Sequence, residues 1–131
     1  MTSLPIELEM LLWSSVLYFL QIMLPALAVD AKEGAAFGLS NRDNTPTTTG
    51  WVARAERAYR NMAESLLPFA CLVLIAQSSG STGETSAMGA TVFFFSRLIY
   101  AFLYPAGITV VRSLAWFGGI VGMGMIVYQI V

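Results

Sequence analysis

Polar side chains interrupt an otherwise apolar segment that runs from Trp51 to Gln77. At about 100° per residue, five of them fall within one arc of about 120° on a helix. Those five are Arg54, Arg57, Arg60, Asn61 and Glu64, whereas Glu56 lies outside the arc. Ionisable groups inside a membrane are costly unless they face a partner or a water-filled cavity. This helix face is therefore the first candidate for a binding site.

The next two apolar segments carry residues of the same kind. Arg97, Tyr100 and Tyr104 stand at i, i+3 and i+7, which places them on one face of a helix. Arg112 opens the last segment. We expect Arg97 and Glu64 to lie at similar depth and to form an ion pair. Guanidinium groups in excess of nearby acids, together with tyrosine hydroxyls, suit an anionic ligand with several carboxylates.

Each of these residues also has a purely structural interpretation. Arg54 is typical of an anchor whose charge reaches the membrane surface along its apolar stem. A Glu64–Arg97 bridge can fix helix packing without binding anything, and Tyr100 and Tyr104 suit the aromatic belt of a membrane protein. The convergence of these groups from three segments at one level favours the ligand site.

The residue inventory excludes several kinds of chemistry. The chain has no histidine, which removes the commonest general base and metal ligand, and we expect no metal site. Its single cysteine cannot form an intramolecular disulfide. No phosphate-binding glycine loop is present. The net charge is -1 and there is no basic patch, so nucleic acid is not an expected partner.

Four long apolar segments must position the polar groups. The chain is 56% hydrophobic and only 11% charged, whereas soluble domains carry about a quarter charged residues. A helix of about 20 apolar residues spans a bilayer. We therefore predict a single domain over residues 1–131, an all-α integral membrane protein with a four-transmembrane-helix bundle. The predicted helices cover residues 8–29, 51–77, 87–104 and 109–130, and residues 30–50 are predicted to form a loop.

The basic residues predict how the chain crosses the membrane. Lys32, Arg42 and Arg54 belong to the first loop and the helix entry that follows it, and Arg112 ends the third loop. Because positive residues stay on the cytoplasmic side, the first and third loops are predicted to be cytoplasmic. The N-terminal flank carries Glu7 and Glu9, unlike a cleavable signal peptide. Short loops and the lack of a targeting signal favour a bacterial inner membrane.

The spacing of these residues resembles one known family. The sequence reads Arg54-x-x-Arg57-Ala58-x-x-Asn61-x-x-Glu64 and then Pro68-Phe69. This pattern is similar to the second-helix signature of the MAPEG family, the membrane-associated proteins in eicosanoid and glutathione metabolism, which include microsomal glutathione transferase. Arg97-x-x-Tyr100-x-x-x-Tyr104 and Arg112-Ser113-Leu114 resemble the third and fourth helices of that family.

The resemblance implies a homotrimer that binds glutathione, as a co-substrate, between neighbouring subunits near the cytoplasmic side. The positions that would bind glutathione are Arg57, Asn61, Glu64, Arg97, Tyr100 and Tyr104. Glu64 would hold the amino group and the arginines the carboxylates. Arg112 resembles the arginine that stabilises the thiolate in the transferases. A fixed guanidinium lowers the pKa of a nearby thiol, and the thiolate is the nucleophile.

The sequence therefore favours a glutathione transferase, with peroxidase activity as a further possibility. Glutathione would enter from the cytoplasm, and a lipophilic electrophile or lipid hydroperoxide would enter from the membrane lipids. One alternative is a non-catalytic family member that binds a small anion or a lipid. Another is a small four-helix transporter with Glu64 as its proton-exchanging group.

Overall fold

Four long helices make up most of the chain. The computed structural model describes residues 3–43 and 46–131. The long helices are α1 (Ile6–Glu33), α3 (Gly50–Ser78), α4 (Glu84–Leu103) and α5 (Val110–Ile130), and each is long and apolar enough to cross a membrane. The predicted all-α bundle with four membrane-spanning helices is therefore confirmed, and the chain is an integral, multi-pass membrane protein.

The largest difference from the sequence prediction lies in the first loop. A single-turn helix, α2 (Ala35–Gly38), interrupts the segment that was predicted to be a loop. The Arg42 guanidinium reaches back to the Asp30 carboxylate at 3.4 Å, so this segment folds onto the end of α1. Helix α1 also extends four residues beyond its predicted end and continues through Pro25. Residues 44 and 45 of the predicted loop lie outside the described residues.

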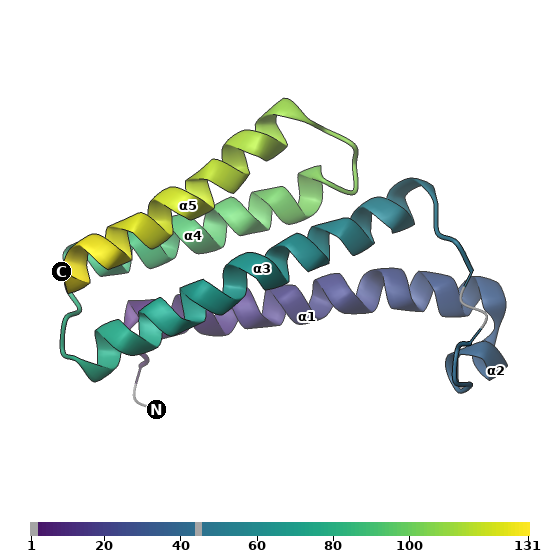
Figure 1. Cartoon of the computed structure of the whole chain (residues 1–131), viewed down its shortest axis with the longest axis horizontal. Coiled ribbons are helices and arrows are strands. Elements are labelled where there is room, and N and C mark those ends of the chain that lie inside the picture. Colours follow the sequence, from purple (N-terminus) through teal and green to yellow (C-terminus); the bar gives the residue numbers. More distant parts are fainter. Residues whose placement is uncertain (1–2, 44–45) are drawn as a thin grey trace.

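The helices are arranged as two antiparallel pairs. Figure 1 shows α1 beside α3, and α4 beside α5, with the described chain ends at the end of the bundle opposite the first loop. Helix α4 also contacts α1 and α3, and α5 contacts α3. The segment before α3 and the α4–α5 turn lie at the same end (Figure 1). Polar residues at the start of α3, the end of α4 and the start of α5 are therefore gathered at that end.

The core is a narrow apolar column between the helices. Phe69 of α3 stacks on Phe93 of α4 with ring centroids 3.8 Å apart, and Met62, Val73 and Ile126 are buried around them. Many other large apolar side chains face outward, such as Phe19, Leu67, Phe102, Leu114 and Tyr128. An outer surface of this kind suits contact with lipid or with other helices.

Two glycines allow α4 and α5 to approach closely. A Cβ added at Gly122 would lie 2.5 Å from the Gly89 carbonyl oxygen, and a Cβ added at Gly89 would lie 2.5 Å from the Gly122 carbonyl oxygen. Small residues at helix contacts are the usual basis of tight packing in membranes. These glycines therefore set how α5 lies along α4.

A buried polar contact joins α1 to α4 at the other end of the bundle. The Ser86 hydroxyl donates to a Glu7 carboxylate oxygen and accepts a 2.9 Å hydrogen bond from the Gly83 backbone N–H. Glu7 is 4% exposed and Ser86 is fully buried. Glu7, which the sequence analysis placed in the polar N-terminal flank, therefore takes part in the packing of α1 against α4.

Replacing Gly122 by alanine should destabilise the bundle by about 1–3 kcal/mol, because the added methyl overlaps the α4 backbone. Denaturant titration in detergent measures the free energy of unfolding. Gly124→Ala is the matched control, since no atom of residues 3–43 and 46–131 lies within 4 Å of its added Cβ. Equal stability of the two variants would contradict the close α4–α5 contact.

Replacing Ser86 by alanine should cost about 1–3 kcal/mol, because the buried Glu7 carboxylate and the Gly83 N–H each lose a partner. The same titration measures the change. Ser15→Ala removes an exposed hydroxyl that bonds only to its own helix, and should shift stability by no more than about 0.5 kcal/mol. If the Ser86 variant is as stable as the Ser15 variant, the Ser86–Glu7 hydrogen bond does not contribute this much to the free energy of unfolding.

Candidate functional site

The first half of α3 has two different faces. Ala55, Ala58 and Met62 are buried against the bundle. The opposite side carries Arg57 and Glu64, both exposed on the surface of the single chain. Asn61 lies between these faces and is partly buried, and its side-chain oxygen is buried without a hydrogen-bond partner among the described residues. The helix thus presents polar groups beside α4 and α5 while its apolar side forms the core.

Arg97 is the most unusual residue of the bundle interior. Its side chain is only 1% exposed, and none of its three guanidinium nitrogens has a hydrogen-bond partner among the described residues. The guanidinium carbon lies 4.2 Å from the centroid of the Tyr100 ring. A cation–π contact contributes about 0.5–2 kcal/mol and leaves the N–H donors unsatisfied. Arg97 therefore has donors available for an anionic group.

Tyr104 lies between two further arginines. The Arg112 guanidinium carbon is 4.3 Å from the centroid of its ring, and that of Arg57 is 5.9 Å away. Arg57 Nε also donates to the Tyr104 hydroxyl at 3.3 Å. The Tyr100 ring follows at 5.4 Å between centroids. Arg57, Arg97 and Arg112, from three helices, are thus connected through two tyrosine rings.

Another arginine fixes the turn that carries Tyr104. Arg54 Nε donates to the Pro105 carbonyl oxygen at 3.0 Å, which ties the start of α3 to the α4–α5 turn. Arg54 therefore acts as a structural tie here, and its role as an interfacial anchor stays a prediction. The bond holds Tyr104 and the start of α5 close to α3.

A cavity of about 250 Å³ opens between α3, the end of α4 and the start of α5. Its lining residues are Asn61, Tyr100, Tyr104, Arg112, Ser113, Trp116 and Phe117. We call it the polar cavity. A second cavity of about 190 Å³ shares Asn61 and Trp116 with it and is lined by Asn61, Glu64, Ser65, Pro68, Trp116, Ile120 and Met123. We call the second one the apolar groove.

The predicted site residues are brought together in different ways. Asn61, Tyr100, Tyr104 and Arg112 line the polar cavity, and Glu64 lines the apolar groove. Arg57 and Arg97 line neither cavity but contact the tyrosines that do. All seven predicted residues thus belong to one connected cluster, in the part of the bundle that is nearer to the first loop and the α4–α5 turn.

The expected Glu64–Arg97 ion pair is wrong. No salt bridge joins these residues in the described part of the chain, and Arg97 is buried while Glu64 is exposed. The reason is helix rotation, because α3 turns Glu64 outward whereas α4 turns Arg97 into the bundle. Similar depth on two helices does not bring two side chains together. Arg60 pairs within its own helix instead, with Glu56 at 3.7 Å.

Sequence reasoning did not assign three lining residues of the polar cavity, namely Ser113, Trp116 and Phe117. They follow Arg112 at i+1, i+4 and i+5, so the helical period could have placed Trp116 beside Arg112. Ser113 was noted only as part of the arginine motif. An apolar residue such as Phe117 gives no signal of its own in an apolar helix.

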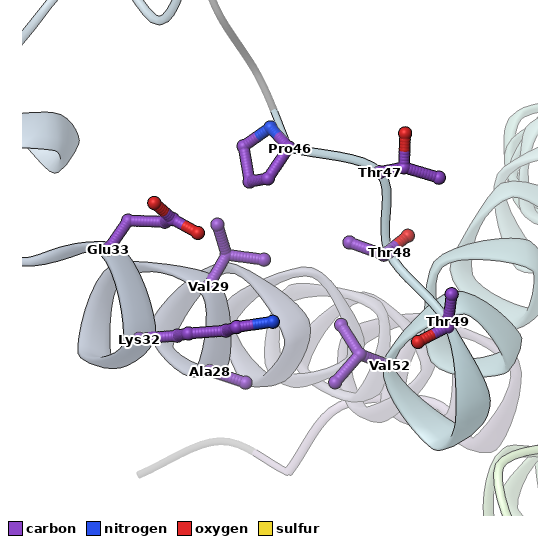
Figure 2. A pocket seen from close by; sticks show the side chains of 9 residues that line it. All are labelled: Ala28, Val29, Lys32, Glu33, Pro46, Thr47, Thr48, Thr49 and Val52. Carbon is purple, nitrogen blue, oxygen red and sulfur yellow. The ribbon is translucent and has the colours of Figure 1, made fainter.

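Three further cavities lie at the first loop. One, of about 80 Å³, lies between the last turns of α1 and the segment that leads into α3, and Figure 2 shows Lys32 of α1 extending toward Val52 there. A second, of about 330 Å³, includes Arg42, Tyr59 and Arg60, and a third, of about 340 Å³, is lined by residues 37 and 40–43. None of the three shares a lining residue with the polar cavity or the apolar groove. They are therefore separate from the arginine–tyrosine cluster.

The cluster offers a specific set of chemical groups. It contributes guanidinium, phenol, hydroxyl and amide groups and one carboxylate, Glu64. No group of three acidic, cysteine or histidine side chains able to hold a metal ion occurs among the described residues. Positive charge beside aromatic rings, with few acids, suits an organic anion.

Comparison with known proteins gives one result. No curated protein and no solved structure matches the chain. The model of the MAPEG family matches residues 10–131, which include every residue of the cluster. The family is membrane-embedded and associated with glutathione and eicosanoid metabolism. The match covers nearly the whole chain, and the protein therefore belongs to the MAPEG family.

Proposed function

We propose that the protein is a membrane-embedded glutathione transferase that joins glutathione to lipophilic electrophiles. The observation that carries the proposal is Arg97, a buried guanidinium with no partner among the described residues, beside a cavity lined by Arg112 and two tyrosines. A buried charge without a counter-ion costs several kcal/mol. A ligand carboxylate would remove that cost, and glutathione has two carboxylates.

The other groups suit the remaining parts of glutathione. The exposed Glu64 carboxylate is proposed to bind the ligand ammonium, and Arg57 the second carboxylate. The Asn61 side-chain oxygen, which is buried with no hydrogen-bond partner in the described part of the chain, is proposed to accept from an amide N–H of the peptide. Tyr100 and Tyr104 offer hydroxyls at the wall of the polar cavity.

Arg112 is proposed to hold the sulfur as a thiolate. Its guanidinium is kept in place over the Tyr104 ring and lines the polar cavity. Attraction to this fixed positive charge lowers the pKa of the glutathione thiol, so no histidine base is required. The sulfur lone pair then forms a bond to the electrophilic carbon, and the leaving group departs with the electron pair of its own bond. With a lipid hydroperoxide, two glutathiones would give glutathione disulfide, the lipid alcohol and water.

We further propose that the protein works as a homotrimer in a bacterial inner membrane, with the arginine–tyrosine cluster at the cytoplasmic side. In support, Arg57 and Glu64 are exposed on the single chain, although they lie on a membrane-spanning helix. Charged groups there need cover from a neighbouring subunit or from water. A detergent complex with the protein mass of one chain, by light scattering, would contradict the trimer.

Replacing Arg97 by methionine separates folding from binding. An apolar side chain of similar length at a buried charged position preserves or raises stability. Glutathione affinity should fall about 30-fold or more, because the ligand carboxylate loses its partner. Calorimetric titration measures affinity, and denaturant titration measures stability. Arg60→Met is the control, since Arg60 is exposed and pairs with Glu56. Unchanged affinity in the Arg97 variant would remove this residue from the site.

Replacing Arg112 by alanine should leave glutathione affinity within a few-fold of wild type while turnover falls about 10²–10³-fold, the usual effect of losing one charge-stabilising group. Conjugation of a nitroaryl chloride, followed at saturating glutathione, gives the rate. Arg42→Ala tests whether the loss is specific, because Arg42 lies in the first loop and lines neither cavity of the cluster. Wild-type turnover without Arg112 would show that this residue does not activate the thiol.

A further inference from the structure

Helix α4 ends in a turn that is closed by a left-handed glycine. The Ile108 N–H donates to the Leu103 carbonyl oxygen at 3.1 Å, and the Gly107 N–H donates to the Tyr104 carbonyl oxygen at 3.0 Å. These two bonds, with Gly107 at a φ of 82°, form the Schellman motif that commonly ends a helix. The motif fixes the backbone at Tyr104, whose ring contacts two arginines of the cluster.

Arg54 of α3 caps this turn from outside. The last carbonyl groups of a helix have no partner within the helix itself. Arg54 Nε donates to one of them, the Pro105 carbonyl oxygen, at 3.0 Å. Its guanidinium also covers Gly107, where an added Cβ would lie 3.7 Å from Nε. A positive charge is favourable at the C-terminal end of a helix dipole. Arg54 thus holds the turn by a hydrogen bond, by contact and by charge.

The capped turn leads to Arg112 by two routes. Helix α5 begins at Val110, directly after the turn, so Arg112 lies in its first turn. The Arg112 guanidinium carbon also lies 4.3 Å from the centroid of the Tyr104 ring, and Tyr104 belongs to the hydrogen-bonded motif. Arg54 itself lines neither the polar cavity nor the apolar groove. Its influence on the polar cavity therefore passes through the turn and not through contact with a ligand.

We propose that Arg54 is a positioning residue, which holds the α4–α5 turn so that Arg112 stays beside the glutathione sulfur. The inference rests on the proposed transferase function. Without the Arg54–Pro105 bond, the turn and the Tyr104 ring gain freedom, and the Arg112 charge no longer stays at a fixed place. Bound glutathione then remains largely a thiol. Its binding continues, because the arginines proposed to hold its carboxylates lie outside the turn.

Two substitutions in the full-length protein in detergent separate the hydrogen bond from the charge. In Arg54→Gln the amide nitrogen stands as many bonds from the backbone as arginine Nε, so a donor is kept and the charge is lost. Arg54→Met loses both. With saturating glutathione, thiolate absorbance against pH gives the pKa of the bound thiol. Arg54→Met should raise it toward the value of about 8.5 of a free thiol. Turnover of a nitroaryl chloride should fall about 10- to 100-fold, whereas Arg54→Gln stays within a few-fold of wild type.

The same turn can be disturbed while Arg54 is kept. Gly107→Ala places a side chain in the left-handed conformation, which is strained, so it should act on the thiol as Arg54→Met does. Gly80→Ala is the matched control. Gly80, at a φ of 68°, closes the same motif at the end of α3, in the α3–α4 turn at the other end of the bundle (Figure 1). The control should lose stability and keep the wild-type thiol pKa.

The outcomes separate this role from the transferase proposal. A wild-type thiol pKa and turnover in Arg54→Met would overturn the positioning role alone, because Arg54 would then only stabilise the fold. Equal losses in Arg54→Gln and Arg54→Met would also overturn it, since the charge would act on the sulfur directly. If Arg54→Met does not fold, wild-type behaviour of Gly107→Ala overturns the role. Saturated wild-type protein without a thiolate signal would overturn the transferase proposal, and the positioning role with it.

Discussion

The buried guanidinium of Arg97 is the constraint on which the rest of the site depends. An arginine that stays charged must have strong local reasons to remain in a membrane bundle without a counter-ion. The Tyr100 ring covers one side of it, 4.2 Å away. Gly119 of α5 covers another side, where an added Cβ would lie 3.5 Å from Arg97 Cδ. Helix α5 therefore packs directly against the buried stem of Arg97 at Gly119.

Helix α5 thus combines packing and chemistry on two of its sides. Gly119 and Gly122 both face α4, and Gly122 allows the close approach of the Gly89 backbone. Arg112, Trp116 and Met123 follow another line along the same helix and form one wall of both cavities. Close packing on the first side fixes the second side relative to Tyr104. The Arg54–Pro105 bond at 3.0 Å holds the other end of the same turn.

The sequence predicts the fold well because long apolar segments have few alternatives in a bilayer. Segment length located all four spans, and helical periodicity placed Arg57, Asn61 and Glu64 together on α3. Rotation of one helix against another is not encoded in that periodicity. For this reason the Glu64–Arg97 pair was wrong, and the burial of Glu7 against Ser86 was not foreseen. Phe117 was missed because an apolar residue on an apolar helix carries no distinguishing pattern, whereas the helical period from Arg112 could have located Trp116.

The central claim is that this cluster binds glutathione and holds its sulfur as a thiolate. The most direct measurement is ultraviolet absorbance of the thiolate while glutathione is added to the purified protein at neutral pH, against the same titration of Arg112→Ala. We predict a saturable thiolate signal in wild type and binding without that signal in the variant. An absence of thiolate signal from wild-type protein that is saturated with glutathione would contradict the account.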